Sequence, residues 1–447
     1  MIIDLDIDTF TYPDVALPDV WTVEQKFDTP ALSLLEIDAQ TRAAVQSLVS
    51  AGSLTRGATV AVGVGSRGLD NLVSTVRSAV AELRALGMQP FIVPAMGSHG
   101  GATAIGQTEV LHGYGVTPEA VGAEIRATME VEQIGTLDTD DADEFEGHPI
   151  FWEKNALSAD AVLLINRIKA HTDFTGEIES GIAKMSVIGL GKRHGAEGIH
   201  RYGALGLREL MPRIARWLTG HMPILGGIAL LENELGRTSE IHALPRGDIG
   251  RAGEKALLRR ARATAPRLPF QELDVLVIDE MGKNISGAGM DTHVIGRGTM
   301  PSIPEATWGG PNIRIIAVLD LTAASHGNAT ALGLADLTTR GLIEKVDFPA
   351  TFINMRTSGE GGVLRGRLPL VLPTGDDCIR SAIATCGRAH AGAVRLARIR
   401  NTADTRFIEI SAALLEEARA NPSLNVSRES RRLDLCCRVG ENDALSV

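Results

Sequence analysis

Three histidines and one lysine stand in glycine-rich or small apolar surroundings that suit chemistry. His99 lies in the sequence GSHGG, and His171, Lys184 and His200 lie in the stretch INRIKAHTDFTGEIESGIAKMSVIGLGKRHGAEGIH. Histidine titrates near neutral pH and can take up or release a proton during a reaction. A lysine within the small apolar run GIAKMSVIG is partly desolvated, which favours the uncharged, nucleophilic amine. These residue types indicate acid–base chemistry together with a covalent anchor or a nucleophile.

Each of these residues also has a simpler interpretation. A lone histidine is more often a surface or packing residue than a catalyst, although the glycine neighbours of His99 and its place after a strand favour function. A zinc site lacks support because no CxxC, HxxxH or HExxH spacing occurs around these histidines. The basic residues of the stretch could form one solvated face, namely Arg167, Lys169, Lys184, Lys192 and Arg193.

A second candidate loop is GVGSRG, residues 63–68, which matches the pattern GxGxxG between a predicted strand and a predicted helix. An NAD site would need an acidic residue at the end of the next strand, but that strand ends in Pro94 and Ala95. Two further interpretations stay open. The loop could be a glycine-rich tight turn, or an anion site in which backbone N–H groups and Arg67 hold a carboxylate or phosphate.

Alternating strands and helices must position these loops. The apolar periodicities predict strands at Thr59–Val64, Phe91–Ala95 and Ala161–Ile165 and a helix from Leu69 to Gly87. Such alternation implies a mainly parallel sheet, whose ligands bind outside the carboxyl ends of the strands. We therefore expect the loops at Gly63, Gly97 and Asn166 to share one rim.

The second half of the chain repeats this alternation, with strand-like sequences LDVLVIDEMGKN and IRIIAVLDL and a helical segment near Ile379–Cys386. A basic helical stretch, GEKALLRRARATAPR, ends at Pro266 and Pro269, which mark a boundary near residue 268. We predict an α/β protein with two α/β domains whose mainly parallel sheets face an active-site cleft. Residues 1–268 would bind the cofactor and carry catalysis, and residues 269–447 would close the cleft.

Composition excludes some classes of function. The 447 residues carry a formal charge of −11, which argues against DNA or an anionic membrane as the main partner. Hydrophobic residues make up 44% and charged residues 22%, the balance of an ordinary globular enzyme. No apolar run is long enough to span a membrane.

The two ends of the chain bear on its cellular location. The N-terminal sequence MIIDLDIDTFTYPDV lacks a basic segment before an apolar core and predicts a strand rather than a signal peptide. All four cysteines, Cys378, Cys386, Cys436 and Cys437, lie near the C-terminus without secretory disulfide spacing. Both features indicate a cytoplasmic protein. The last thirty residues could either pack back onto the fold or fray.

The histidine loop, the quoted stretch and two downstream segments, MGKNISGAGMD and ASHGNATALGLADLTTR, together resemble the nickel-dependent lactate racemase family of 2-hydroxy acid racemases and epimerases. The resemblance covers most of the chain. It implies a nickel pincer nucleotide cofactor (nickel pyridinium-3,5-bisthiocarboxylic acid mononucleotide) that is bound covalently to a lysine. In that family two sulfurs, a pyridinium carbon and one histidine hold the nickel.

The resemblance implies a role for each of the four residues introduced first. Lys184 resembles the lysine that tethers the cofactor, and His200 resembles the nickel-ligating histidine, with the family's spacing between them. His99 and His171 resemble the pair of catalytic acid/bases. The implied partners are a small 2-hydroxy acid substrate and the enzymes that synthesise the cofactor.

The resemblance also implies substrate-binding residues, but the match at these positions is incomplete. Arg67, preceded by Ser66, resembles the arginine of the family's Asp-x-Thr-Arg motif, but Val64 stands in place of the aspartate and Gly68 in place of the usual proline. This departure leaves the identity of the hydroxy acid open. Lys283 is similar to a family lysine that reaches the substrate from the second domain.

The residue types suit this chemistry independently of the resemblance. Racemisation by oxidation and re-reduction needs one base for each enantiomer, and two histidines on separate loops can alternate as acid and base. It also needs an electrophilic cofactor that stores the hydride. Two alternatives remain: an NAD-dependent hydroxy acid dehydrogenase, based on GxGxxG, and a non-catalytic anion-binding protein that uses the same loop and the basic residues.

Overall fold

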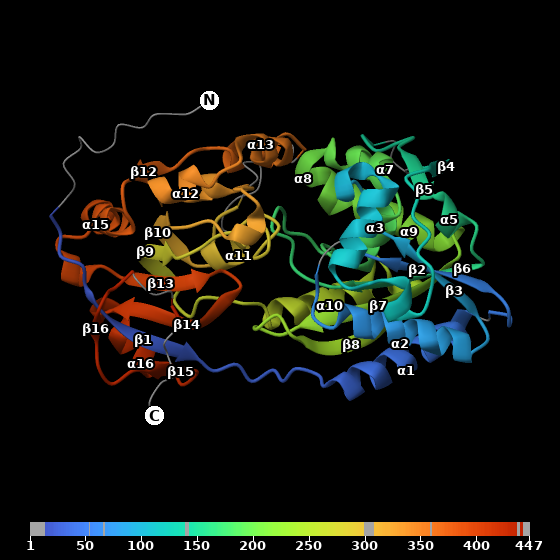
Figure 1. Ribbon diagram of the computed structural model, residues 1–447, viewed down its shortest axis with the longest axis horizontal. Coiled ribbons are helices and arrows are strands. Elements are labelled where there is room, and N and C mark those ends of the chain that lie inside the picture. The colour runs from blue at the N-terminus through green and yellow to red at the C-terminus, as the bar shows by residue number, and fades with distance from the viewer. Residues whose placement is uncertain are drawn as a thin grey trace. The chain divides into compact units, whose positions relative to one another are not determined.

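The computed structural model describes residues 14–52, 54–65, 68–138, 143–298, 308–357, 360–435 and 439–440. It divides the chain into two compact units. The N-terminal unit is Thr29–Ala265, and the C-terminal unit combines the described residues up to Asp28 with those from Pro266 onward. Each unit has helices packed on a β-sheet, so the predicted α/β class is confirmed (Figure 1).

The N-terminal unit is built on a five-stranded sheet in the order β3-β2-β6-β7-β8, parallel except for β8 at one edge. A separate antiparallel hairpin joins β4 and β5. The strands are β2 (Thr59–Val64), β3 (Gln89–Pro94), β4 (Val131–Thr136), β5 (Pro149–Glu153), β6 (Ala161–Arg167), β7 (Ile224–Glu232) and β8 (Thr238–Pro245). The α-helices are α1 (Leu34–Gly52), α2 (Leu72–Ala85), α3 (Ala104–Gly113), α4 (Pro118–Val121), α5 (Lys154–Leu157), α6 (Ile182–Lys184), α7 (Lys192–His200), α8 (Gly203–Leu205), α9 (Met211–His221) and α10 (Ala252–Ala263).

Alternation along the strands explains how this sheet is covered. Val60, Val62 and Val64 on β2 belong to one buried cluster with apolar side chains of α1 and α2. On β7, a Cβ added to Gly227 would lie 2.7 Å from the side chain of Ile182 in α6. Because successive strand residues point to opposite faces, α1 and α2 cover one face while α6 packs closely against the other.

The predicted local elements of this unit are confirmed with small changes at their ends. The strand predicted at Thr59–Val64 is β2, and the strands predicted at 91–95 and 161–165 are β3 and β6. The helix predicted from Leu69 starts only at Leu72, because Asn71 has a left-handed backbone with φ 61°. The basic stretch before Pro266 forms α10.

The C-terminal unit has a larger sheet in the order β12-β11-β10-β9-β13-β14-β1-β15, with β16 also paired to β1. It is parallel from β12 to β13 and antiparallel beyond. Its strands are β1 (Asp19–Gln25), β9 (Glu272–Ile278), β10 (Asn312–Val318), β11 (Leu337–Thr339), β12 (Leu370–Leu372), β13 (Leu396–Asn401), β14 (Asp404–Ser411), β15 (Leu424–Val426) and β16 (Arg431–Arg432). Its α-helices are α11 (Thr292–Ile295), α12 (Arg340–Glu344), α13 (Phe348–Thr357), α14 (Glu360–Arg365), α15 (Gly375–Thr385) and α16 (Leu415–Ala420).

The boundary predicted near residue 268 lies close to the observed division between Ala265 and Pro266. The assignment of the whole segment before it to one domain is wrong, because β1 belongs to the C-terminal unit. There it pairs antiparallel with β14, in a register that places Val20 opposite Ser411. This long-range pairing completes the antiparallel side of the larger sheet. Most of the predicted N-terminal strand, residues 1–13, lies outside the described residues.

The described part of the C-terminal tail packs back onto its unit. Leu433 is buried and donates its N–H to the Pro18 carbonyl. Val439 is also buried, and its N–H donates to the Asp279 carboxylate at 3.0 Å. Cys378 and Cys386 are buried free thiols, whereas Cys436 and Cys437 lie outside the described residues. In the described part of the chain no helix is long and apolar enough to cross a membrane.

Candidate active site

The candidate active site lies where the order of the parallel strands reverses. The chain passes from β2 to β3 on one side and then returns to β6 on the other side of β2. Such a switch point is where ligands bind in open α/β sheets, outside the carboxyl ends of the strands. Since β3, β2 and β6 are neighbours and parallel, the predicted common rim for the loops at Gly63, Gly97 and Asn166 is confirmed.

The loop after β2 approaches the loop after β6 closely. A Cβ atom on Gly65 would lie 3.6 Å from the Asn166 amide oxygen and 3.6 Å from the Met185 methyl group. Glycine at this position leaves room at the rim between the two loops. Ser66 and Arg67 lie outside the described residues, so their contact with a substrate stays a prediction.

The GxGxxG loop lacks the surroundings of a dinucleotide fingerprint. Helix α2 begins at Leu72, several residues after Gly68, and the turn before it presents the Asp70 carboxylate. That carboxylate accepts the Thr238 N–H at 2.9 Å and pairs with Arg237 at 3.2 Å. A carboxylate next to the helix N-terminus repels the pyrophosphate that the fingerprint would bind there. Strand β3 ends at Pro94, without the acid that a ribose would need.

His171 and Lys184 lie in direct contact. The His171 Nε2 and Lys184 Nζ atoms are 2.5 Å apart, and both side chains are half-buried. The other ring nitrogen, Nδ1, accepts the backbone N–H of Asp173 at 3.0 Å. The imidazole also packs on the Phe174 ring with centroids 4.7 Å apart. A base is thus held beside an amine and oriented by a third group, the arrangement that activates nucleophiles in enzymes.

A buried carboxylate holds the loop that carries His171. The Glu179 side chain has no exposed surface, and its oxygens accept the N–H groups of His171 at 2.6 Å and Gly176 at 2.7 Å. Arg262 of α10 completes the arrangement with an ion pair of 2.5 Å. The Glu179 carboxylate therefore fixes the backbone position from which the imidazole projects.

Replacing Glu179 by alanine should destabilise the protein, because two half-buried N–H groups would lose their acceptor and Arg262 its ion-pair partner. Each unsatisfied group costs about 1–3 kcal/mol, so we expect a loss of roughly 2–4 kcal/mol in the free energy of unfolding. Urea titration followed by circular dichroism measures this change. Glu177→Ala is the matched control, because the exposed Glu177 carboxylate only pairs with Lys255 at the surface and should change stability by about 0.5 kcal/mol or less. Equal losses in the two variants would contradict the assignment.

The same helix, α10, also supports the segment of Lys184. The buried Glu254 carboxylate accepts the N–H of Ala183 at 3.0 Å and that of Gly250 at 2.8 Å. Burial raises the pKa of Glu254, although these backbone hydrogen bonds oppose the change. Lys184 ends α6, and the chain continues in a π-helical turn, Met185–Gly189. Single π-helical turns of this kind are frequent at functional sites.

His99 lies at the exposed tip of the loop after β3. Below it, the Gly97 N–H donates to the Gly189 carbonyl at 3.1 Å, which joins this loop to the π-helical turn after Lys184. The Gln107 side chain of α3 donates to the Gly97 carbonyl at 2.8 Å. The loops of both predicted acid/bases are therefore fastened to the same helical segment.

Lys192 is buried and holds residues next to the His99 loop. This finding corrects the alternative interpretation that Lys192 lies on a solvated face. Its side chain is completely buried, and its amine donates to the Pro94 carbonyl at 2.5 Å and to the Gln107 amide oxygen at 2.8 Å. Burial lowers the pKa of Lys192 to about 8, and the nearby Glu153 carboxylate opposes this shift. Arg193, by contrast, is exposed and pairs with Glu197.

Sequence reasoning missed four residues that position the site: Gln107, Glu179, Lys192 and Glu254. Gln107 and Glu254 stand in no motif, and their site partners lie 10 and 71 positions away. Glu179 lies within the quoted stretch and holds residues of its own loop. Lys192 showed one weak sign of a positioning role, because it stands between Gly191 and the Arg193-His194-Gly195 sequence. Its backbone is left-handed with φ 51°, a conformation that is uncommon outside glycine.

His200 is the last residue of α7 and is half-buried. It follows Lys184 along the same helical segment, but no described contact joins the two side chains. Across the described ranges no group of three or more His, Cys, Asp or Glu side chains is arranged to hold a metal ion.

Lys283 lies in the C-terminal unit, in the loop that follows β9. Its amine donates to the Gly287 carbonyl at 2.7 Å, and its backbone N–H donates to the Ser325 hydroxyl at 2.9 Å. The Thr322 hydroxyl, which follows β10, donates to the Asn284 amide oxygen at 2.6 Å. The two downstream segments of the predicted resemblance thus meet at the carboxyl ends of β9 and β10. The role of Lys283 toward a substrate stays a prediction.

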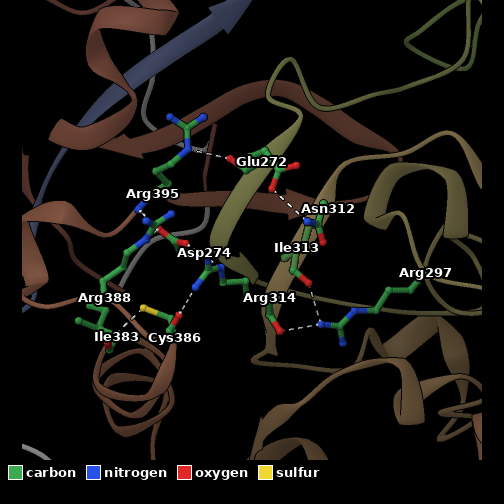
Figure 2. Close-up of polar contacts among 10 residues, drawn as sticks. All are labelled: Glu272, Asp274, Arg297, Asn312, Ile313, Arg314, Ile383, Cys386, Arg388 and Arg395. Carbon is green, nitrogen blue, oxygen red and sulfur yellow. Dashed lines mark hydrogen bonds and ion pairs between the residues drawn. The ribbon is translucent and has the colours of Figure 1, made fainter. Parts of the chain in front are cut away.

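A second cluster of charge in the C-terminal unit lies at the opposite ends of these strands. Figure 2 shows Asp274, near the start of β9, between the guanidinium groups of Arg388 at 2.8 Å and Arg314 at 3.3 Å. Burial raises the pKa of Asp274, but hydrogen bonds from Arg388 and the Arg395 N–H outweigh it and hold the pKa below its ordinary value. Because Asp274 stabilises these arginines at the amino ends of the strands, we assign the cluster a structural role.

Comparison with known proteins identifies neither a family nor a function for this chain. No profile of a known protein family matches the chain, and no curated protein matches it significantly. Among solved structures, the chain is similar to the crystal structure of a Thermotoga maritima protein determined by the Northeast Structural Genomics Consortium. The TM-score is 0.48 with 13% sequence identity, and the match covers 80% of this chain and 91% of that chain.

Proposed function

We propose that the protein is a racemase or epimerase that inverts C2 of a 2-hydroxy acid, with His99 and His171 as acid/bases and a nickel pincer nucleotide tethered to Lys184. The observation that carries the proposal is the 2.5 Å contact between the His171 ring and the Lys184 amine at the switch point of the sheet. It joins a group suited to proton transfer with a group suited to covalent attachment.

The residues present fit the proposed cofactor. The half-buried Lys184 amine lies beside a histidine, the arrangement expected of a covalent anchor. His200 on the same helical segment supplies one imidazole, which suits nickel when the cofactor brings the remaining donors. Gly65 leaves space at the rim next to Met185. When bound, the cofactor would supply a reversible hydride acceptor for C2 of the substrate.

The histidines account for the proton transfers. His171 would remove the hydroxyl proton of one enantiomer while hydride leaves C2, which gives the 2-keto acid. After the keto group presents its other face, His99 would return a proton to the oxygen as hydride returns to carbon, and the roles reverse for the other enantiomer. Glu179 and Gln107 hold the two loops, so each base keeps its position while the substrate reorients.

Arg67, Ser66 and Lys283 are the proposed substrate-binding residues, with a bidentate contact from Arg67 to the carboxylate. The proposed setting is the cytoplasm, where cofactor-synthesis enzymes would load the protein. The formal charge of −11 supports a small-molecule substrate over a nucleic acid. The NAD-dependent alternative is weakened by Asp70 and Pro94 at the GxGxxG loop.

If hydride leaves C2 and later returns to it, the hydrogen on C2 should not exchange for deuterium during racemisation in D₂O. We expect the racemised product to keep its original hydrogen, because a hydrogen that moves as hydride never exchanges with water. The measurement is proton NMR of C2 as optical activity decays, starting from one pure enantiomer of an active hydroxy acid and protein made together with the cofactor-synthesis enzymes.

The outcomes separate the alternatives. Deuterium incorporation at the rate of racemisation would indicate an enolate route and sink the hydride mechanism. Accumulation of keto acid in the presence of NAD would support the dehydrogenase. Binding of hydroxy acids without any change in optical activity would support the anion-binding protein.

A further inference from the structure

A cavity of about 460 Å³ lies within the C-terminal unit, beside helix α13 and the C-terminal end of α14. Most of its lining is apolar and includes the side chains of Leu332, Val346, Phe348, Phe352, Met355 and Leu368. Pockets that bind small molecules typically measure roughly 300–1,000 Å³ and combine apolar walls with a few polar groups. The proposed reaction makes no use of this cavity.

Close contacts hold the walls of the cavity together. The Thr351 hydroxyl of α13 donates to the Asp347 carbonyl at 2.8 Å and accepts the Ala329 N–H at 3.1 Å. Gly366, which follows α14, lies so near α13 that a Cβ atom there would overlap the Met355 sulfur. The cavity is therefore formed before a ligand binds, which lowers the entropic cost of binding.

Apolar side chains remain exposed at the mouth of the cavity. Phe352 and Leu368 both line it, yet their exposed fractions are 63% and 46%. Burial of apolar surface is worth about 25 cal/mol per Å², so a ligand that covers these two side chains gains affinity from them. The lining thus favours a ligand with an apolar body over a small polar one.

The charged groups of the lining favour an anion. Arg365 and Arg367 stand against Asp347 alone, which leaves one positive charge in excess. The Asp347 carboxylate accepts the Ala350 N–H at 2.9 Å, so it is engaged with the N-terminus of α13. Arg365 is buried, whereas Arg367 is exposed and forms no ion pair with any residue in the described ranges. The Arg367 guanidinium can therefore bind one carboxylate through two parallel hydrogen bonds.

We propose that this cavity binds a small carboxylate that carries an apolar chain. The carboxylate pairs with Arg367 at the mouth, and the chain lies against Phe352, Met355 and Leu368. A phosphate ester would bring a second negative charge next to Asp347, so the lining favours a carboxylate. The site uses none of the residues that the proposed function assigns to substrate or cofactor. It therefore stands independently of the proposed function.

The test is equilibrium dialysis of the purified full-length protein against radiolabelled decanoate, with unlabelled decanoate, decanol and acetate as competitors. We expect saturable binding of about one decanoate per chain. Decanol, which lacks the charge, and acetate, which lacks the chain, should each compete about tenfold less effectively or worse than decanoate. The absence of saturable binding, or equal competition by decanol, would overturn the proposal.

Two substitutions at exposed positions test whether the decanoate lies in this cavity. Arg367→Met should weaken binding about tenfold or more, because it removes the charge-assisted contact and keeps an unbranched apolar side chain. Leu368→Asp should weaken it to a similar extent, because the new carboxylate repels the ligand. The matched controls are Arg419→Met, at an exposed arginine of α16, and Leu370→Asp, at an exposed leucine of β12 outside the lining.

Both control variants should bind decanoate as the wild type does, and circular dichroism checks that all four variants are folded. Unchanged binding in either Arg367→Met or Leu368→Asp would assign the decanoate to another part of the protein and overturn the proposal. None of these measurements requires racemase activity, so a failure of the proposed function would leave them intact.

Discussion

His171→Asn is expected to lower the rate of racemisation about 10²-fold or more in both directions, and His99→Asn should do the same. A positioned acid or base typically contributes 10²–10⁴-fold to rate, and each turnover would use one histidine as base and the other as acid. Asparagine suits position 171 because its amide oxygen can still accept the Asp173 N–H that the ring nitrogen accepts at 3.0 Å. The loss should therefore reflect proton transfer rather than collapse of the loop.

The measurement is the initial rate of change in optical activity from each pure enantiomer, with nickel content determined on the same samples. His112→Asn is the control, because this exposed histidine lies at the end of α3, outside the histidine loops. Full activity in both single variants would remove the two-base assignment.

Lys192 should make the free energy of unfolding increase with pH. Its pKa in the folded protein is about 8 against an ordinary value of 10.5, so the unfolded chain binds more protons between these limits. The contribution of Lys192 to stability therefore rises with pH across this window and is least favourable below pH 8. A change of this size in pKa corresponds to about 3 kcal/mol, since each tenfold change in proton affinity is about 1.4 kcal/mol.

Urea titrations of the wild type and Lys192→Met at pH 7.5, 9 and 10.5 measure this effect as a difference, so groups that titrate equally in both proteins cancel. We expect the wild type to gain about 3 kcal/mol relative to the variant between the first and last pH. Lys255→Met is the control, because its lysine lies at the surface and pairs with Glu177. A difference between wild type and Lys192→Met that does not change with pH would show that folding does not lower the pKa of Lys192.

The same network links Lys192 to His99. Lys192 fixes the Gln107 side chain, which in turn holds the Gly97 carbonyl two residues before the histidine. This chain of contacts passes through buried groups and leaves little freedom at the base of an exposed loop. The tip that carries His99 is thus supported by residues that never meet the substrate.

The sequence by itself determined the strands and helices around the candidate site and the edge of the sheet at which its loops meet. Short continuous apolar runs such as TVAVGV specified β2, β3 and β6, because a strand that is buried on both faces carries apolar side chains on both. The glycines at positions 65 and 97 marked the loops that follow β2 and β3, where the chain lies next to Met185 and Ile188. Parallel order followed from the alternation with helices, so the meeting of the His99 and His171 stretches at one edge could be predicted before any contact was known.

Only the tertiary structure decided which polar residues are buried and what they hold. Lys192 and its partner Pro94 are 98 positions apart, and Glu254 is 71 positions from Ala183. No local pattern distinguishes a buried, fully bonded lysine or glutamate from an exposed one, because burial depends on segments that meet only in the folded chain. The same reason explains why β1 joins the C-terminal unit: its partner β14 lies near the other end of the sequence, and a strand's alternation specifies its faces but not its neighbour.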